Sequence, residues 1–170
     1  QVRTLARVSE ADSLGRLYSA VTARYNFQSD KHEGKVTGLA AFGSASAAVD
    51  VLRKHVEVRN GIPHIKYARS FLSQGVAIFL RQSGLNTRAA ASMKDIADMA
   101  TSKTFNYPDL AFAVQIVLEQ AVCEMVDYWV ERTGVPDVSL AGGVFSNVRL
   151  NQLIQERPRV NSVRVFPNMG

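Results

Sequence analysis

The chain has 170 residues, 46% of them hydrophobic and 21% charged, which is typical of one soluble globular domain. Its formal net charge of +5 is scattered, with no basic run longer than Arg53-Lys54, and suits a small anionic substrate as well as a polyanion. The single cysteine, Cys123, excludes an internal disulfide, and no apolar run reaches the roughly 18 residues that span a membrane. We therefore expect a buried thiol at Cys123 and a cytoplasmic protein.

The first part of the chain predicts short elements joined by polar turns. Apolar spacing and turn residues define each of them. In order, we expect a strand at 2–8, a helix at 14–25 and a glycine-rich segment at 32–43. A helix capped by Ser44 or Ser46 follows and ends near Lys54. Residues 56–64 then form a strand with a turn at Asn60-Gly61. The glycines of segment 32–43 are too many for a helix interior and too regular for a random loop.

The second part is dominated by one long helix, whose first turn carries Pro108. The predicted elements are helices at 67–82, 93–99 and 107–132, a strand at 138–141, a helix at about 146–155 and a strand at 162–166. The order of long helix, strand, helix and strand indicates an α/β fold with a right-handed parallel crossover near the C-terminus.

The stretch LAGGVFSNVRLNQ, residues 140–152, places Gly142 and Gly143 where the predicted strand passes into a helix. Without a Cβ, such a corner lets a ligand or another backbone approach closely. The following helix start offers unpaired N–H groups and a positive dipole end, which favour phosphate or another anion. A tight turn that packs closely for its own sake is the alternative.

The stretch HEGKVTGLAAFG, residues 32–43, is the second unusual motif. Lys35 is a candidate to reach a phosphate or a carboxylate, and Glu33 to accept hydrogen bonds from ribose hydroxyls. Arg16, on the helix just upstream, is a candidate second cation. The alternatives are a solvated Glu33–Lys35 pair, a surface position for Arg16, and a capping or packing role for His32.

Five motifs follow one another in the order SLGRLYSAVT, HEGKVTGLAAFG, DLAFAVQIVLEQAV, LAGGVFSNVRLNQ and VFPNMG. In this order and spacing the chain resembles the carbamoyltransferase family that includes the nodulation protein U type and antibiotic-tailoring O-carbamoyltransferases. The resemblance covers nearly the whole chain, and residues 45–103 contribute least to it. Thr37 stands where Met is expected, and Phe145-Ser146 where Ala-Leu is common, but neither departure removes a candidate ligand.

The resemblance implies an α/β fold that is half of an actin, Hsp70 and sugar-kinase-like (ribonuclease H-like) ATPase domain, with a mixed sheet and flanking helices. Residues 1–170 would form a single lobe, a fragment of a larger domain related to the tRNA threonylcarbamoyladenosine-forming enzyme. A YrdC-like domain of the same parent chain would make carbamoyl-adenylate from carbamoyl phosphate and ATP. The first domain would then pass the carbamoyl group to a hydroxyl of a small-molecule acceptor.

The resemblance also implies a nucleotide site. The glycine pair would lie against the nucleotide, the asparagine that follows it near the sugar or phosphates, and the start of the second motif near the ribose and phosphates. The implied residues are Gly142, Gly143, Asn147, Glu33, Gly34 and Lys35.

Members of the family also hold iron or another divalent metal through a His-rich motif and an aspartate just after the PNMG loop. His32, His55 and His64 lack that spacing, and the chain stops at Gly170, so we expect the metal ligands outside this chain and the isolated lobe to be inactive. We expect no membrane and no nucleic-acid partner, and self-association through the apolar helix at 107–132.

Three other functions fit the same residues. They are a threonylcarbamoyl transferase acting on tRNA, a non-catalytic assembly lobe in which the glycines only pack, and a kinase of the same fold superfamily.

Overall fold

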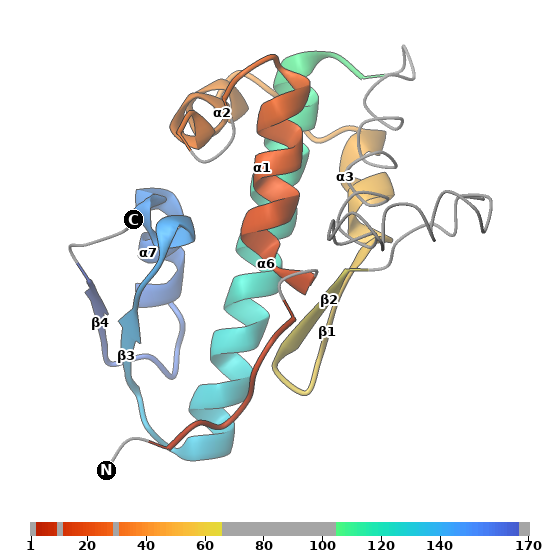
Figure 1. Ribbon diagram of the computed structural model, residues 1–170. Helices are drawn as coiled ribbons and strands as arrows, with labels where there is room; N and C mark the ends of the chain where they lie inside the picture. The colour runs from red at the N-terminus through yellow and green to blue at the C-terminus, as the bar shows by residue number, and fades with distance from the viewer. Residues whose placement is uncertain (1–2, 10–11, 29–30, 66–104, 167–170) are drawn as a thin grey trace, which may run out of the picture.

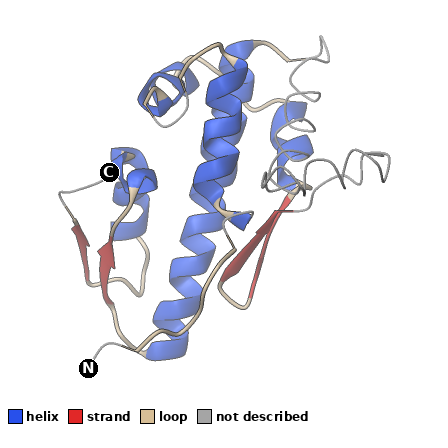
Figure 2. Ribbon diagram, viewed as in Figure 1, coloured by secondary structure: helices blue, strands red, loops and turns tan. Residues whose placement is uncertain are grey.

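The computed structural model describes residues 3–9, 12–28, 31–65 and 105–166 (Figure 1). The predicted helices at 67–82 and 93–99 lie outside these residues. One long helix, α6 (Tyr107–Thr133), runs through the middle, and the strands form two separate pairs on opposite sides of it (Figure 2). No described helix combines the length and apolar character that crossing a membrane requires.

The ends of α6 follow from its sequence. Asn106 caps the helix by accepting a hydrogen bond from the Asp109 N–H at 2.8 Å, and Pro108 occupies the first turn. Gly134 ends it in the left-handed conformation, with φ 69°. The predicted stripe of Ala111, Val114, Leu118, Ala121 and Val122 is buried, and Met125 and Trp129 are partly buried. This stripe is the centre of the core.

Three short helices pack in the upper half of the molecule around α6. The predicted helix at 14–25 is confirmed as α1 (Leu14–Arg24), which buries Leu17 and Val21. Ser46 caps α3 (Ala47–Arg53) by accepting from the Ala48 N–H, as one of the two predicted serines. The third helix, α2, falls in the glycine-rich segment.

The expectation that segment 32–43 has too many glycines for a helix is wrong. Residues Glu33–Ala40 form α2, which buries Val36 and Ala40 in the core shared with α6. Glycine weakens a helix by only about 1 kcal/mol relative to alanine, so this burial outweighs two glycines. A third glycine has a packing reason, because a Cβ at Gly43 would lie 2.1 Å from the carbonyl oxygen of Pro108.

The predicted strand and turn at 56–64 is a hairpin of β1 (Val56–Arg59) and β2 (Ile62–Ile65). Its turn residues Asn60 and Gly61 both have positive φ, 51° and 70°, which is what a tight two-residue hairpin turn requires. The turn is held on α6, where the Trp129 indole N–H donates to the Gly61 carbonyl at 2.8 Å.

The C-terminal elements form a parallel pair. Strands β3 (Asp137–Leu140) and β4 (Ser162–Val165) run parallel and are connected through α7 (Val148–Gln155), as predicted. The helix predicted from about 146 begins at Val148, because a short 3-10 turn, η2 (Gly143–Ser146), comes first and Asn147 has extended backbone. An asparagine at this position stops one turn and caps the next.

Two further expectations need correction. Residues 3–8 form no strand, because their alternation is not matched by a hydrogen-bonded partner strand among the described residues. The described strands make one antiparallel and one parallel pair and not a single mixed sheet. The fold is therefore α/β, with helices flanking two small sheets, and its relation to the larger ATPase fold stays a prediction.

Candidate functional site

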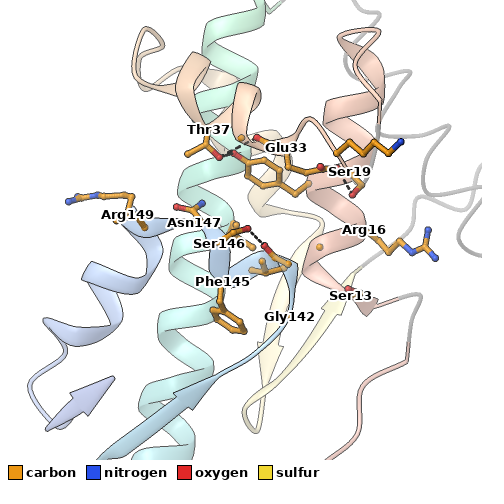
Figure 3. Close-up of a pocket in the computed structure, with 18 of the residues that line it drawn as sticks. Ser13, Arg16, Ser19, Glu33, Thr37, Gly142, Phe145, Ser146, Asn147 and Arg149 are labelled. Atoms are coloured by element: carbon orange, nitrogen blue, oxygen red, sulfur yellow. Dashed lines mark hydrogen bonds between the residues drawn. The ribbon is translucent and has the colours of Figure 1, made fainter. Parts of the chain in front are cut away.

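A cavity of about 960 Å³ lies between α1, α2 and the segment that links β3 to α7 (Figure 3). Apart from Leu118 of α6, its lining comes from three stretches that are far apart in the sequence. The α1 side provides Ser13, Arg16 and Ser19; the α2 side provides Lys31, Glu33, Gly34 and Thr37; the third side provides Gly142, Gly143, Ser146, Asn147 and Arg149. Five of the six predicted site residues line this cavity, and Lys35 does not.

The backbone at Gly142 explains why a glycine stands there. Its φ of 106° and ψ of 159° belong to a region that is accessible almost only to glycine. The corner is fixed by the Phe145 N–H, which donates to the Gly142 carbonyl at 3.0 Å, and the Ser146 hydroxyl donates to the Gly143 carbonyl. A Cβ at Gly142 would meet nothing within 4 Å, so this wall stands clear of other protein atoms.

The start of α2 forms the facing wall. Glu33 is half-buried and its Oε1 accepts a hydrogen bond from the Ser19 hydroxyl at 3.0 Å, which fixes the carboxylate across the gap between α1 and α2. Gly34 follows it and is exposed, and a Cβ built there would also meet nothing within 4 Å. A carboxylate in this place can accept hydrogen bonds from ligand hydroxyls.

Lys35 and His32 are held elsewhere. The Lys35 ammonium lies 5.1 Å from the centroid of the Phe27 ring, a cation–π contact outside the cavity wall. The His32 ring packs edge-on against the same Phe27, and its Nδ1 accepts from the Gln28 N–H at 3.1 Å. His32 therefore packs, as its alternative interpretation held.

Asn147 is anchored at both ends of its amide. Its Oδ1 accepts from the Leu150 N–H at 3.2 Å, which caps α7, and its Nδ2 donates to the Gln115 Oε1 at 2.9 Å. The side chain thus fixes the start of α7 beside the glycine corner, in addition to lining the cavity.

A polar cluster buried between the walls was not predicted from the sequence. Gln115 and Glu119, each only 7% exposed, lie in the buried face of α6, and the Gln115 Nε2 donates to the Glu119 Oε1 at 2.7 Å. The Tyr18 hydroxyl donates to the Gln115 Oε1 at 3.0 Å and lies 2.8 Å from the Thr37 Oγ1. The signal that could have found this cluster is a polar i, i+4 pair inside an apolar stripe.

Burial is the main influence on the pKa of Tyr18. Loss of solvent raises the pKa of its phenol to about 12, against the lowering effect of its hydrogen bond with Thr37. The hydroxyl therefore stays protonated at neutral pH and is available as a donor to Gln115.

The whole chain matches one protein family. The family model described as carbamoyltransferase N-terminus matches residues 1–170. The chain belongs to the carbamoyltransferase family. The resemblance of the five motifs to this family is confirmed. Membership associates this carbamoyltransferase chain with carbamoyl transfer in general.

The relatives of this carbamoyltransferase chain are much longer proteins. It is 29% identical over 151 residues to the nodulation protein NolNO of Sinorhizobium fredii, covering 89% of this chain and 20% of that protein. It is 26% identical to the uncharacterized protein MJ1058 of Methanocaldococcus jannaschii, over 93% of this chain and 23% of that protein. The match to the uncharacterized protein sll1178 of Synechocystis is also 26%, over 93% of this chain and 25% of that protein.

The charges around the cavity are mixed. Arg16, Lys31 and Arg149 contribute cations, and in Figure 3 the guanidinium groups of Arg16 and Arg149 extend outward on opposite sides. The Arg149 Nε lies 3.9 Å from the Glu119 Oε1, so the guanidinium forms a long ion pair with the buried carboxylate. Cations at the rim and a carboxylate on the wall suit a ligand with both phosphate and hydroxyl groups.

The described residues do not fit a metal ion of the kind that the family resemblance implies. Among residues 3–9, 12–28, 31–65 and 105–166, no three His, Cys, Asp or Glu side chains come together to hold one.

Proposed function

We propose that this chain forms the nucleotide-binding wall of an ATP-dependent O-carbamoyltransferase, which moves a carbamoyl group from carbamoyl phosphate, through carbamoyl-adenylate, to a hydroxyl of a small-molecule acceptor. The observation that carries the proposal is the cavity in which the Gly142-Gly143 corner faces the Glu33-Gly34 start of α2. Both walls lack side-chain bulk at their glycines, so a flat group can approach the backbone closely.

Each wall has a separate task in this proposal. The Glu33 carboxylate, fixed by Ser19, accepts hydrogen bonds from the ribose hydroxyls of the adenylate. The Gly142-Gly143 corner provides the surface against which the nucleoside lies, and the Arg16 and Arg149 side chains at the rim attract the phosphates. Asn147 holds the corner and the start of α7 in register.

The chemistry explains why such tight holding is required. Carbamoyl-adenylate is a mixed anhydride that water would hydrolyse. In the transfer, the acceptor oxygen bonds to the carbamoyl carbon, the bond between that carbon and the phosphate oxygen breaks, and AMP leaves as the hydroxyl proton is released. An enzyme gains rate here by fixing the AMP part and by excluding water from the reacting carbon.

The test is isothermal titration of ATP, AMP and carbamoyl phosphate into the full-length protein, with wild type beside Gly143→Val. The valine adds bulk to the cavity wall at a position whose φ is not positive. The matched control is Gly38→Val, which adds the same side chain on α2 at a position outside the cavity where a Cβ meets nothing.

We expect nucleotide binding that Gly143→Val abolishes and Gly38→Val leaves intact, with both variants folded by circular dichroism. Unchanged binding in both variants would mean that the glycine corner is only a packing turn and that the nucleotide binds elsewhere. A tight complex with tRNA that weakens steeply with salt would replace the small acceptor with a nucleic acid.

A further inference from the structure

We infer that Gln115 is a positioning residue, which ties the two walls of the cavity together and sets their separation for the nucleotide. The inference rests on the proposed function for the identity of the ligand, but the link between the walls stands on contacts within the protein. Gln115 does not line the cavity, so any effect it has on the ligand acts through the residues that it holds.

The geometry places Gln115 at a junction between elements. Its Oε1 accepts from the Tyr18 hydroxyl of α1 at 3.0 Å and from the Asn147 Nδ2 of the α7 start at 2.9 Å. These partners lie 97 and 32 residues away in the sequence. One carbonyl oxygen with two lone pairs thus joins the α1 side of the cavity to the start of α7.

The same junction reaches α2. The Tyr18 hydroxyl lies 2.8 Å from the Thr37 Oγ1, and Thr37 lines the cavity one turn beyond Glu33 on α2. On the other side, Asn147 follows the η2 turn that begins at Gly143. A shift of Gln115 would therefore be passed to both the carboxylate wall and the glycine corner.

Glu119 fixes which way the Gln115 amide faces. A glutamine amide can rotate by half a turn, which would exchange its oxygen and nitrogen. The Glu119 Oε1, an acceptor 2.7 Å from the Gln115 Nε2, requires the nitrogen on its side and so directs the oxygen toward Tyr18 and Asn147. Because Gln115 and Glu119 are each only 7% exposed, water competes little for these hydrogen bonds.

The experiment compares Gln115→Met with Gln120→Met in the full-length protein. Methionine keeps the length of the side chain and removes its hydrogen-bonding atoms. Gln120 is the matched control, since it lies on the same helix but is exposed and hydrogen-bonds Arg53 at the surface. Tyr18→Phe, which removes one donor and keeps the ring, is the second variant should Gln115→Met fail to fold. Because Tyr18 itself lines the cavity, hydrogen exchange and not affinity is the deciding readout for that variant.

Two readouts separate the junction from the ligand. Backbone hydrogen exchange, followed by mass spectrometry without nucleotide, reports on segments 33–40 and 147–155. Isothermal titration reports the affinity for the adenine nucleotide that wild type binds. We expect Gln115→Met to speed exchange in both segments and to weaken nucleotide binding by about tenfold or more, and Gln120→Met to change neither.

Exchange in Gln115→Met that matches wild type in both segments would overturn the inference. So would faster exchange with unchanged nucleotide affinity, because Gln115 would then be a purely structural group. A wild-type protein that binds no nucleotide would refute the proposed function instead, and the exchange result alone would then decide whether Gln115 joins the walls.

Discussion

The glycine at the start of α2 allows a test in which stability and binding move in opposite directions. Gly34 and Gly38 both lie in α2, neither has a positive φ, and a Cβ at either would meet nothing within 4 Å. Only Gly34 lines the cavity. The pair Gly34→Ala and Gly38→Ala therefore adds the same methyl group inside and outside the proposed nucleotide site.

The expected magnitudes follow from helix propensity and packing. Replacing a helical glycine by alanine stabilises the helix by about 0.5–1 kcal/mol, and less near its first turn, so neither variant should lower the unfolding temperature. A methyl group in a ligand-filled wall costs about 1–3 kcal/mol of overpacking, which corresponds to roughly 5- to 150-fold weaker nucleotide binding for Gly34→Ala.

The assay is titration calorimetry of AMP and ATP with the full-length protein, together with thermal unfolding of both variants. Gly38→Ala should bind like wild type. Equal affinities for all three proteins would refute the reasoning, because a ligand that tolerates a methyl at Gly34 does not lie against that wall. Weaker binding in both variants would refute it too, since the effect would then come from the helix and not from the cavity.

Three more predictions follow from the backbone and from burial. Gly142→Ala should lower stability by about 1–3 kcal/mol in denaturant unfolding, since its φ of 106° strains any residue with a Cβ although nothing blocks the side chain. Gly43→Ala should destabilise the protein because the added Cβ would lie 2.1 Å from the Pro108 carbonyl oxygen, which is a steric clash and not backbone strain. This variant should lower the yield of folded protein. The raised pKa of Tyr18, about 12 against 10.0, favours the neutral phenol, so its stabilising contribution is present below pH 10 and is lost as the pH rises to 12. Ultraviolet difference titration of wild type against Tyr18→Phe should show that phenolate only near pH 12, and its appearance near pH 10 would contradict burial as the cause.

Local signals in the sequence predicted most of the described helices and the hairpin. The cap at Asn106, the first-turn proline and the glycine at 134 fix the long helix, and Asn60-Gly61 fixes the turn of the hairpin. These features depend only on residues that are close together in the sequence, so a local sequence pattern can predict them. Of the strand expected at 2–8, the described residues 3–8 form none, because a strand needs a hydrogen-bonded partner and no local pattern supplies one.

The site was predicted only in part, because local motifs show its pieces but not how the pieces come together. The glycine corner and the start of α2 are motifs, whereas their meeting in one cavity depends on how α1, α2 and α7 pack around α6. Lys35 was expected there from its position between glycines, but the direction of its side chain is set by Phe27, which a linear motif does not reveal. Asn147 was likewise predicted as a nucleotide contact from its motif, and its role as the cap of α7 was not predicted.

The buried pair on α6 links the fold to the proposed site. An apolar helix face is most stable when all its buried positions are apolar, and replacing a buried polar network by well-packed apolar groups is often neutral or stabilising. Gln115 and Glu119 break that rule in the middle of the core stripe, and their polar contacts with Tyr18, Asn147 and Arg149 reach residues that line the cavity. Departures of this kind from the logic of a stable core are expected where function constrains the chain. The two residues are thus better explained by the spacing of the walls than by the stability of the helix that carries them.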